Sequence, residues 1–265
     1  MLLAGVVMKL GAYGCLRVAM TMFPHGMDPW GFSFLGIDSW RMVFALLASI
    51  GIVYGASVAL VQKDFKFVIG YSSVSHMGFV LLGLMTLNQI GLSGAVLQMY
   101  SHGVIAGLLF AVAGRMVYDR THTRDLSELG PMHLARLIPF AAVTFAIASM
   151  ASIGLPGFSG FVAEFEILIG AWRAFPTLAM MAGAGILIGI AFTWRALDKA
   201  FFGEGPAAER VTVQCPRISL AERMGAAILI AATLAVGVYP RLLLDLIIPA
   251  LNSPLFDGLR KGVWR

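Results

Sequence analysis

Charged residues are scarce in this chain of 265 residues. Only 12% of its residues are Asp, Glu, Lys or Arg, about half the share of a soluble domain. Hydrophobic residues make up 59% and the mean hydropathy is +0.85. The apolar runs are roughly 20 residues or longer, enough to cross a hydrocarbon core. This composition excludes a soluble globular domain and predicts a polytopic membrane protein.

Alternating strand patterns and cysteine motifs are also missing. Transmembrane barrel strands are ~10 residues long and alternate apolar with polar residues, which these runs do not, so we expect an all-α fold. The two cysteines, Cys15 and Cys215, form no C-x-x-C pair. A cysteine-ligated iron–sulfur cluster within the chain is therefore excluded. No histidine pair at i,i+4 spacing with a third ligand is present, so no metal site is predicted.

A signal peptide and a nucleic-acid-binding surface are not indicated either. Met1 leads directly into an apolar run, without a charged segment before it or a small-residue cleavage pattern after it. Lys9 interrupts that run, and we expect the chain to begin partway through a larger protein. The net charge of +5 arises from cations in short loops, where they report membrane topology rather than contact with nucleic acid.

Seven apolar segments are predicted to span the membrane as a single transmembrane domain over residues 1–265. Lysine and arginine concentrate in the loops at 63–66, 115–136 and 195–223, and cytoplasmic loops carry the excess of these residues. This predicts a cytoplasmic N-terminus and a periplasmic C-terminus in a bacterial-type inner membrane. The predicted spans are 1–22, 42–62, 67–87, 91–116, 137–172, 177–202 and 220–248.

The fifth predicted span is discontinuous. The stretch S-I-G-L-P-G-F-S-G-F-V-A-E-F-E begins at Ser152 and places Pro156 within an apolar run. Proline removes a backbone donor and clashes with the preceding turn, and the glycines around it loosen the chain. Inside a membrane, freed backbone groups need a hydrated cavity covered by protein. The sequence therefore predicts a broken helix beside a wet, buried space.

The basic residues inside the predicted spans include Lys9, His76 and His102. A lysine in mid-span costs several kcal/mol unless it is paired, hydrated or deprotonated, and such residues mark ion pathways. An imidazole accepts on one nitrogen and donates on the other near neutral pH. Taken singly, each histidine is explained by helix–helix hydrogen bonding. Taken together, with serines beside them to hold water, they favour a proton relay.

Two acids, Glu164 and Glu166, follow the break in the fifth span. They stand two residues apart, about 200° around a helix, so only one of them faces a common polar channel. We assign Glu164 to the relay. Glu166 is expected at the membrane interface, as a bystander.

Five segments together carry a resemblance to a known family. They are K-L-G-A-Y-G-C-L-R, K-D-F-K-F-V-I-G-Y-S-S-V-S-H-M-G-F, Q-M-Y-S-H-G-V-I-A-G-L-L-F, R-T-H-T-R-D-L and G-L-P-G-F-S-G-F-V-A-E-F. They occur in order along nearly the whole chain. The set resembles chain M, the antiporter-like membrane subunit of proton-pumping NADH–quinone oxidoreductases, the complex I family.

The resemblance implies a fold and roles for individual residues. The family has fourteen transmembrane helices in two inverted repeats, and this chain resembles the last seven, with most of the second repeat. Lys9 then resembles the central lysine, His76 and His102 the histidines of the hydrophilic axis, and Glu164 the terminal acid of the broken helix. Glu166 matches no functional position of the family. The upstream glutamate–lysine pair of the family and its first broken helix have no counterpart here.

The resemblance also implies partners. Flavin, iron–sulfur clusters and quinone would be bound by other subunits, with no cofactor in this chain. The neighbours would be other membrane subunits, including antiporter-like chains, a chain or segment with the missing N-terminal half, and lipid. Two alternatives stay open. One is a subunit of a multi-subunit cation/proton antiporter or a membrane-bound hydrogenase, and the other is an inactive truncated scaffold.

Overall fold

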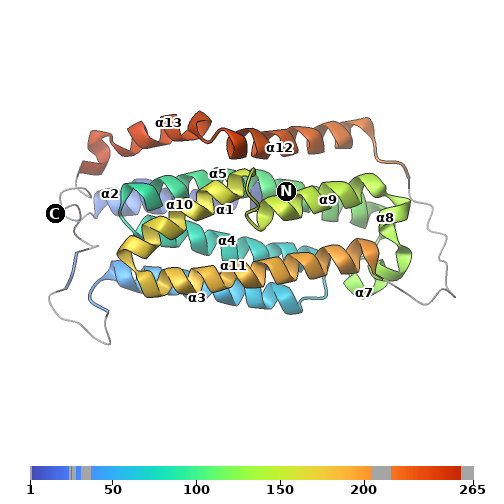
Figure 1. Cartoon of the computed structure of the whole chain (residues 1–265), viewed down its shortest axis with the longest axis horizontal. Coiled ribbons are helices and arrows are strands. Elements are labelled where there is room, and N and C mark those ends of the chain that lie inside the picture. The colour runs from blue at the N-terminus through green and yellow to red at the C-terminus, as the bar shows by residue number, and fades with distance from the viewer. Residues whose placement is uncertain (1, 24, 26–27, 31–36, 204–215, 258–265) are drawn as a thin grey trace.

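The computed structural model describes all residues except 1, 24, 26–27, 31–36, 204–215 and 258–265, so Cys215 lies outside the described part. The described residues form helices and no strand, with one isolated β-bridge between Asp64 and Asp125. The long helices lie side by side with their axes along one direction (Figure 1). The predicted all-α, polytopic membrane fold is confirmed.

Six helices within the described residues are long and apolar enough to cross a membrane. The first runs from Leu3 to Met22 and contains α1 and α2; the fourth runs from Gln89 to Thr121 and contains α5 and α6; the fifth runs from Pro176 to Phe202 and contains α11. The named helices are α1 (Met8–Gly14), α2 (Met20–Met22), α3 (Trp40–Val61), α4 (Phe65–Met85), α5 (Gln89–Phe110), α6 (Asp119–Thr121), α7 (Leu126–Leu129), α8 (Leu134–Leu137), α9 (Pro139–Ser152), α10 (Ser159–Ala174), α11 (Pro176–Leu197), α12 (Leu220–Val238) and α13 (Arg241–Leu251).

The predicted break in the fifth span lies between α9 and α10. Helix α9 ends at Ser152 and α10 begins at Ser159, and Pro156 stands in the connection. Gly154 and Gly157 both have positive φ values, 72° and 101°. Only glycine adopts this region without a steric penalty, so the G-L-P-G sequence dictates the turn. The two half-helices continue each other along the bundle (Figure 1).

A second break divides the last predicted span into α12 and α13, which the sequence reading missed. The cause is Pro240, which has no backbone donor and forces Tyr239 out of the helical conformation, with φ −127° and ψ 75°. This second break lies against the first. A Cβ atom placed on Gly237 would stand 2.2 Å from the carbonyl oxygen of Gly157, so α12 packs directly on the connection between α9 and α10.

The basic loops gather at one end of the bundle. Asp64 caps α4 and pairs through its backbone with Asp125. The Asp125 carboxylate accepts the backbone N–H of Ser127 and caps α7. Hydrogen bonds from Ser127 also lower the pKa of the Asp125 carboxyl. Arg195 donates to the carbonyl oxygens at the end of α3, which otherwise have no partner within their helix.

Candidate functional site

Glu164 lies in the second turn of α10 and is buried, with 5% of its surface exposed. One carboxylate oxygen accepts hydrogen bonds from His76 Nδ1 on α4 at 3.0 Å and from Gln98 Nε2 on α5 at 3.2 Å. The other oxygen points back to the break, because a Cβ on Gly154 would lie 2.9 Å from it. Glu164 therefore joins three helices and the broken connection.

His76 bridges Glu164 and the end of α9. Its Nε2 atom lies 3.2 Å from the hydroxyl of Ser152, which ends α9. An ionised carboxylate only accepts hydrogen bonds. In the neutral imidazole, Nδ1 therefore donates to Glu164 while Nε2 accepts from Ser152. The ring holds a proton on one side and an acceptor on the other, as a relay requires.

Two of the serines near His76 in sequence bind backbone carbonyl oxygens rather than the imidazole. Ser73 donates to the carbonyl oxygen of Ile69, and Ser75 donates to that of Ile52. Successive residues on a helix point about 100° apart, so neighbours in sequence face elsewhere. The hydroxyl that contacts His76 comes from Ser152, on another helix.

His102 lies beside His76, with ring centroids 5.2 Å apart and the planes tilted by 42°. It is buried, and its Nδ1 atom makes no hydrogen bond within the described part of the chain. The Oε1 atom of Gln98, one helical turn away, is equally unpartnered among the described residues. Buried polar atoms of this kind are bound by ordered water in most proteins. Both atoms are suited to bind water next to the two imidazoles.

Lys9 approaches the same cluster from the first helix. That helix packs closely on α5, since a Cβ on Gly103 would lie 2.8 Å from the carbonyl oxygen of Gly5. Lys9 follows Gly5 by one turn, is 8% exposed, and donates to the carbonyl oxygen of Ala4. Its ammonium lies within electrostatic range of His102. The structure thus brings the four predicted residues together in the order Lys9, His102, His76 and Glu164.

Sequence reasoning missed two members of the cluster, Gln98 and Ser152. Gln98 had a readable signal: it is a buried amide in mid-span, four residues before His102, and therefore on the same helix face. Ser152 had a weaker sequence signal, which was its position at the edge of the glycine–proline break. Its contact with His76 depends on how α9 meets α4, which the local sequence does not determine.

Glu166 occupies the flank of α10 away from His76. It is partly buried near the middle of α10 and accepts a hydrogen bond of 2.9 Å from Ser93 on α5. Packing against α5 holds Glu166 partway along α10, and its place at the membrane interface stays a prediction. The prediction that the two acids face different partners agrees with these contacts.

Three hydroxyls fasten the break to its neighbours. Ser159, the first residue of α10, lies 2.7 Å from the hydroxyl of Ser101 on α5 and 2.9 Å from that of Thr233 on α12. All three residues are fully buried. These hydrogen bonds between the three hydroxyl groups fix the start of α10, and with it the direction in which Glu164 points.

Comparisons with known proteins place this site in a family. The family model described as "NADH:quinone oxidoreductase/Mrp antiporter, TM" matches residues 1–190, which include Lys9, His76, His102 and Glu164. The chain belongs to this family.

Relatives and solved structures agree with this membership. The NADH-quinone oxidoreductase subunit M of Rhodobacter capsulatus is 39% identical over 94% of this chain and 46% of its own length. Respiratory complex I from Thermus thermophilus contains a chain that is 30% identical with a TM-score of 0.81, covering 96% of this chain and 50% of that one. The Mrp complex of Dietzia sp. matches at 23% identity with a TM-score of 0.71, over 85% of this chain and 48% of its own, and shows likeness of fold.

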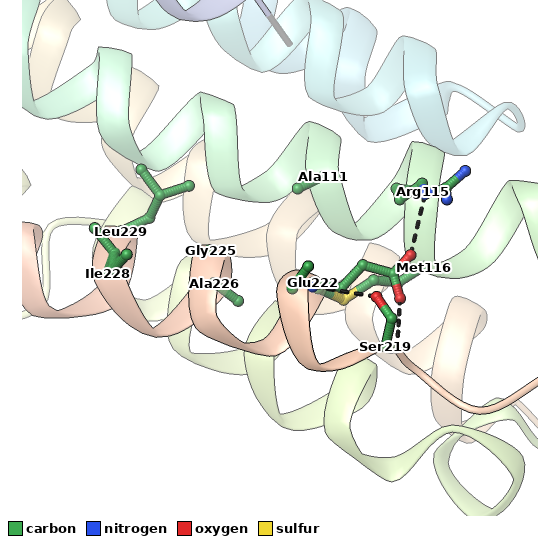
Figure 2. Close-up of a pocket in the computed structure, with 10 residues that line it drawn as sticks. Ala111, Arg115, Met116, Ser219, Glu222, Gly225, Ala226, Ile228 and Leu229 are labelled. Carbon is green, nitrogen blue, oxygen red and sulfur yellow. Dashed lines mark hydrogen bonds and ion pairs between the residues drawn. The ribbon is translucent and has the colours of Figure 1, made fainter.

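A large cavity lies against α12, away from the cluster of Lys9, His102, His76 and Glu164. This cleft of about 590 Å³ separates α12 from the continuation of α5. Figure 2 shows Arg115, Glu222 and Ser219 together at one end and Ile228 and Leu229 at the other. Glu222 accepts from Arg115 and caps the start of α12 with Ser219. The polar end thus anchors α12, and the remainder of the cleft is apolar. In the described residues, no group of His, Cys, Asp or Glu is placed to hold a metal ion.

Proposed function

We propose that this member of the family is a proton-translocating membrane-arm subunit of an NADH–quinone oxidoreductase. One observation carries the proposal: Lys9, His102, His76 and Glu164 form a row of side chains across four helices, three of them buried and His76 largely so. Ionisable residues inside a membrane are costly and mark proton or ion pathways. Relatives named as subunit M at 35–39% identity support the choice of this enzyme.

Proton movement along the row would be driven by repulsion between neighbouring cations. Two charges 5.2 Å apart, the separation of the histidine rings, repel by about 3 kcal/mol at an effective dielectric constant of ~20. Simultaneous protonation of both rings is therefore strongly disfavoured. When His76 carries a proton on both ring nitrogens, a proton that reaches His102 from Lys9 drives the Nδ1 proton of His76 onto Glu164 and leaves His76 neutral, with its remaining proton on Nε2. Glu164 then releases it towards the outside or the next subunit.

The proposal assigns the redox chemistry to partner subunits. Flavin, iron–sulfur clusters and quinone would bind there, and electron transfer would reach this chain only as a change of charge at Lys9. The neighbours are other membrane subunits, including antiporter-like chains, and lipid. The membrane is a bacterial-type inner membrane, with the basic loops on the cytoplasmic side and the C-terminus in the periplasm.

The chain spans about half the length of the curated relatives it matches. We therefore propose that the remaining half of the fold is supplied by a further segment or a second polypeptide. That half would carry the charged pair that changes the protonation of Lys9. The relay described here is then the outer part of a longer path.

A second candidate function is a subunit of a cation/proton antiporter. The fold likeness to the Mrp complex favours it, but a fold hosts many functions. An inactive scaffold is the third candidate. Four largely buried ionisable groups, each close to the next in the row, are costly to keep in a membrane without a function, which argues against the scaffold.

The test is Glu164→Gln in the assembled complex, with Glu166→Gln as the matched control. Glutamine keeps the shape and an acceptor for His76 but cannot take up a proton. We expect NADH-driven proton uptake by membrane vesicles to fall by roughly 100-fold or more, the scale of a lost acid–base group. The control should pump as the unmodified complex does. Undiminished pumping by Glu164→Gln would refute the relay.

A further inference from the structure

Two small cavities lie between His76 and the end of the bundle that carries the basic loops. The first is bounded by His76, Glu164, Ser152 and Thr193. The second is bounded by Ser149, Ser152, Thr193 and Phe145. Each measures about 20 Å³, and a water molecule needs at least ~10–15 Å³ on the same scale. Each cavity therefore has room for about one water.

The two cavities share part of their walls. Ser152 and Thr193 line both, so a water in either cavity has the same two hydroxyls within its wall. Ser149 adds a third hydroxyl to the second cavity. It is 4% exposed, and its oxygen makes no hydrogen bond within the described residues. A buried hydroxyl without a protein partner beside a water-sized cavity is the arrangement that ordered water satisfies.

The direction of this row follows from α9. Ser152, Ser149 and Phe145 are spaced by three and four residues, so they lie on one face of α9, in that order towards its start. Helix α9 begins at Pro139, at the end of the bundle where α7 and α8 lie (Figure 1). The row thus leads from His76 towards the basic loops.

Three buried phenylalanines close the row at that end. The Phe145 ring lies 5.0 Å from that of Phe65 and 5.5 Å from that of Phe201, measured between centroids, and each side chain is at most 2% exposed. Phe65 directly follows Asp64, whose backbone pairs with the loop residue Asp125. The cluster therefore separates the second cavity from the polar loops. Dry apolar constrictions of this kind gate channels by excluding water.

We propose that Ser149, Ser152 and Thr193, with one water in each cavity, form a proton-uptake branch to His76 that the cluster of Phe65, Phe145 and Phe201 gates. In each transfer an oxygen accepts one proton and releases its own, so no hydroxyl changes its net protonation. The last acceptor is His76 Nε2, and the Nδ1 proton passes to Glu164. The direction of flow rests on the proposed function, whereas the existence of the hydrated branch does not.

The first test is a density map of the assembled complex, sharp enough to show ordered water. We expect water within hydrogen-bonding distance of both the Ser149 and the Ser152 hydroxyls. This measurement needs no variant and no activity. A map in which those hydroxyls contact no water overturns the branch.

The second test measures passive proton flux into vesicles that hold the complex, without NADH, under a potassium diffusion potential. Phe145→Ala removes the ring that closes the row and should raise the flux several-fold. Adding Thr193→Val should return the flux close to the unmodified level. Adding Thr144→Val should not, because the Thr144 hydroxyl donates to the carbonyl oxygen of Phe140 and lines neither cavity.

A third measurement covers the case in which Phe145→Ala does not assemble. Ser149→Ala and Thr193→Val, each without the phenylalanine change, should slow NADH-driven pumping several-fold, while Thr144→Val leaves it unchanged. Unaltered pumping in both, or a Phe145→Ala leak that Thr193→Val does not reduce, overturns the branch. Failure of the relay is read separately, as unaltered pumping by Glu164→Gln.

Discussion

The two flanks of α10 hold carboxylates two residues apart in different surroundings. Glu164 is buried and accepts from His76 and Gln98, on two different helices. Glu166 is partly buried, and Ser93 is its one donor in the part of the chain that the structure describes. Ser93 also donates to the carbonyl oxygen of Ile90 in its own helix. Glu164 is thus part of a hydrogen-bond network, whereas the donor to Glu166, the Ser93 hydroxyl, can bond to Ile90 instead.

The packing around the two acids also differs. Near Glu166 the backbones of α5 and α10 almost touch: a Cβ on Gly94 would lie 2.8 Å from the backbone nitrogen of Ile167, and one on Gly170 would lie 2.5 Å from Gly91 Cα. Near Glu164 the helices leave space for an amide, two imidazoles and a cavity. Close packing excludes water, whereas the wider flank admits it. The same residue type therefore serves different purposes on the two flanks.

The largest expected difference is in stability, on removing each carboxylate. Glu164→Ala leaves the donors of His76 and Gln98 buried without an acceptor, which should cost about 3 kcal/mol. Glu166→Ala leaves no orphaned donor, since Ser93 keeps its bond to Ile90, and should cost less than about 1 kcal/mol. In thermal unfolding of the purified complex, the unfolding temperature of this subunit should fall by roughly 6–12 °C for Glu164→Ala. Equal drops for the two variants would contradict the distinction.

An intermediate effect is expected from the close-packed flank. Gly170→Ala places a methyl group against the backbone of Gly91, which cannot move aside as a flexible side chain would. Overpacking of this kind costs about 1–3 kcal/mol. Gly107→Ala is the matched control, because a Cβ there meets nothing within 4 Å. Unfolding temperatures should fall for the first variant and stay constant for the second. A harmless Gly170→Ala would mean that the helices are less tightly packed than the structure describes.

Much of this arrangement was predictable from local sequence. The apolar runs predicted the membrane fold, the G-L-P-G motif predicted the break, and the helical angle between Glu164 and Glu166 predicted that they face different partners. The break at Pro240 was also readable, since a proline in the interior of an apolar run removes a backbone donor and restricts the residue before it. Hydropathy alone predicts one span from 220 to 248, because Pro240 does not interrupt the apolar run.

The contacts between distant helices were not predictable. Ser152 and His76 are 76 positions apart, and their bond depends on the angle at which α9 meets α4. The wall shared by the two small cavities depends in the same way on where α11 places Thr193. A single sequence specifies which residues are polar and which face of a helix they occupy. It does not specify which residue of a distant helix each one meets.

The smallest expected difference comes from the serine partners of the two flanks. Ser152→Ala leaves His76 Nε2 without its hydroxyl, in a side chain that is only 12% exposed, and should cost about 1 kcal/mol. Ser93→Ala takes one donor from a carboxylate that is only partly buried, so a cost below about 0.5 kcal/mol is expected. Proton pumping adds a second reading, because the Ser152 hydroxyl lies beside the relay and that of Ser93 does not. Pumping should slow for Ser152→Ala and stay unchanged for Ser93→Ala. If Ser93→Ala slowed pumping instead, the proton path would run along the Glu166 flank, and the assignment of the two acids would have to be exchanged.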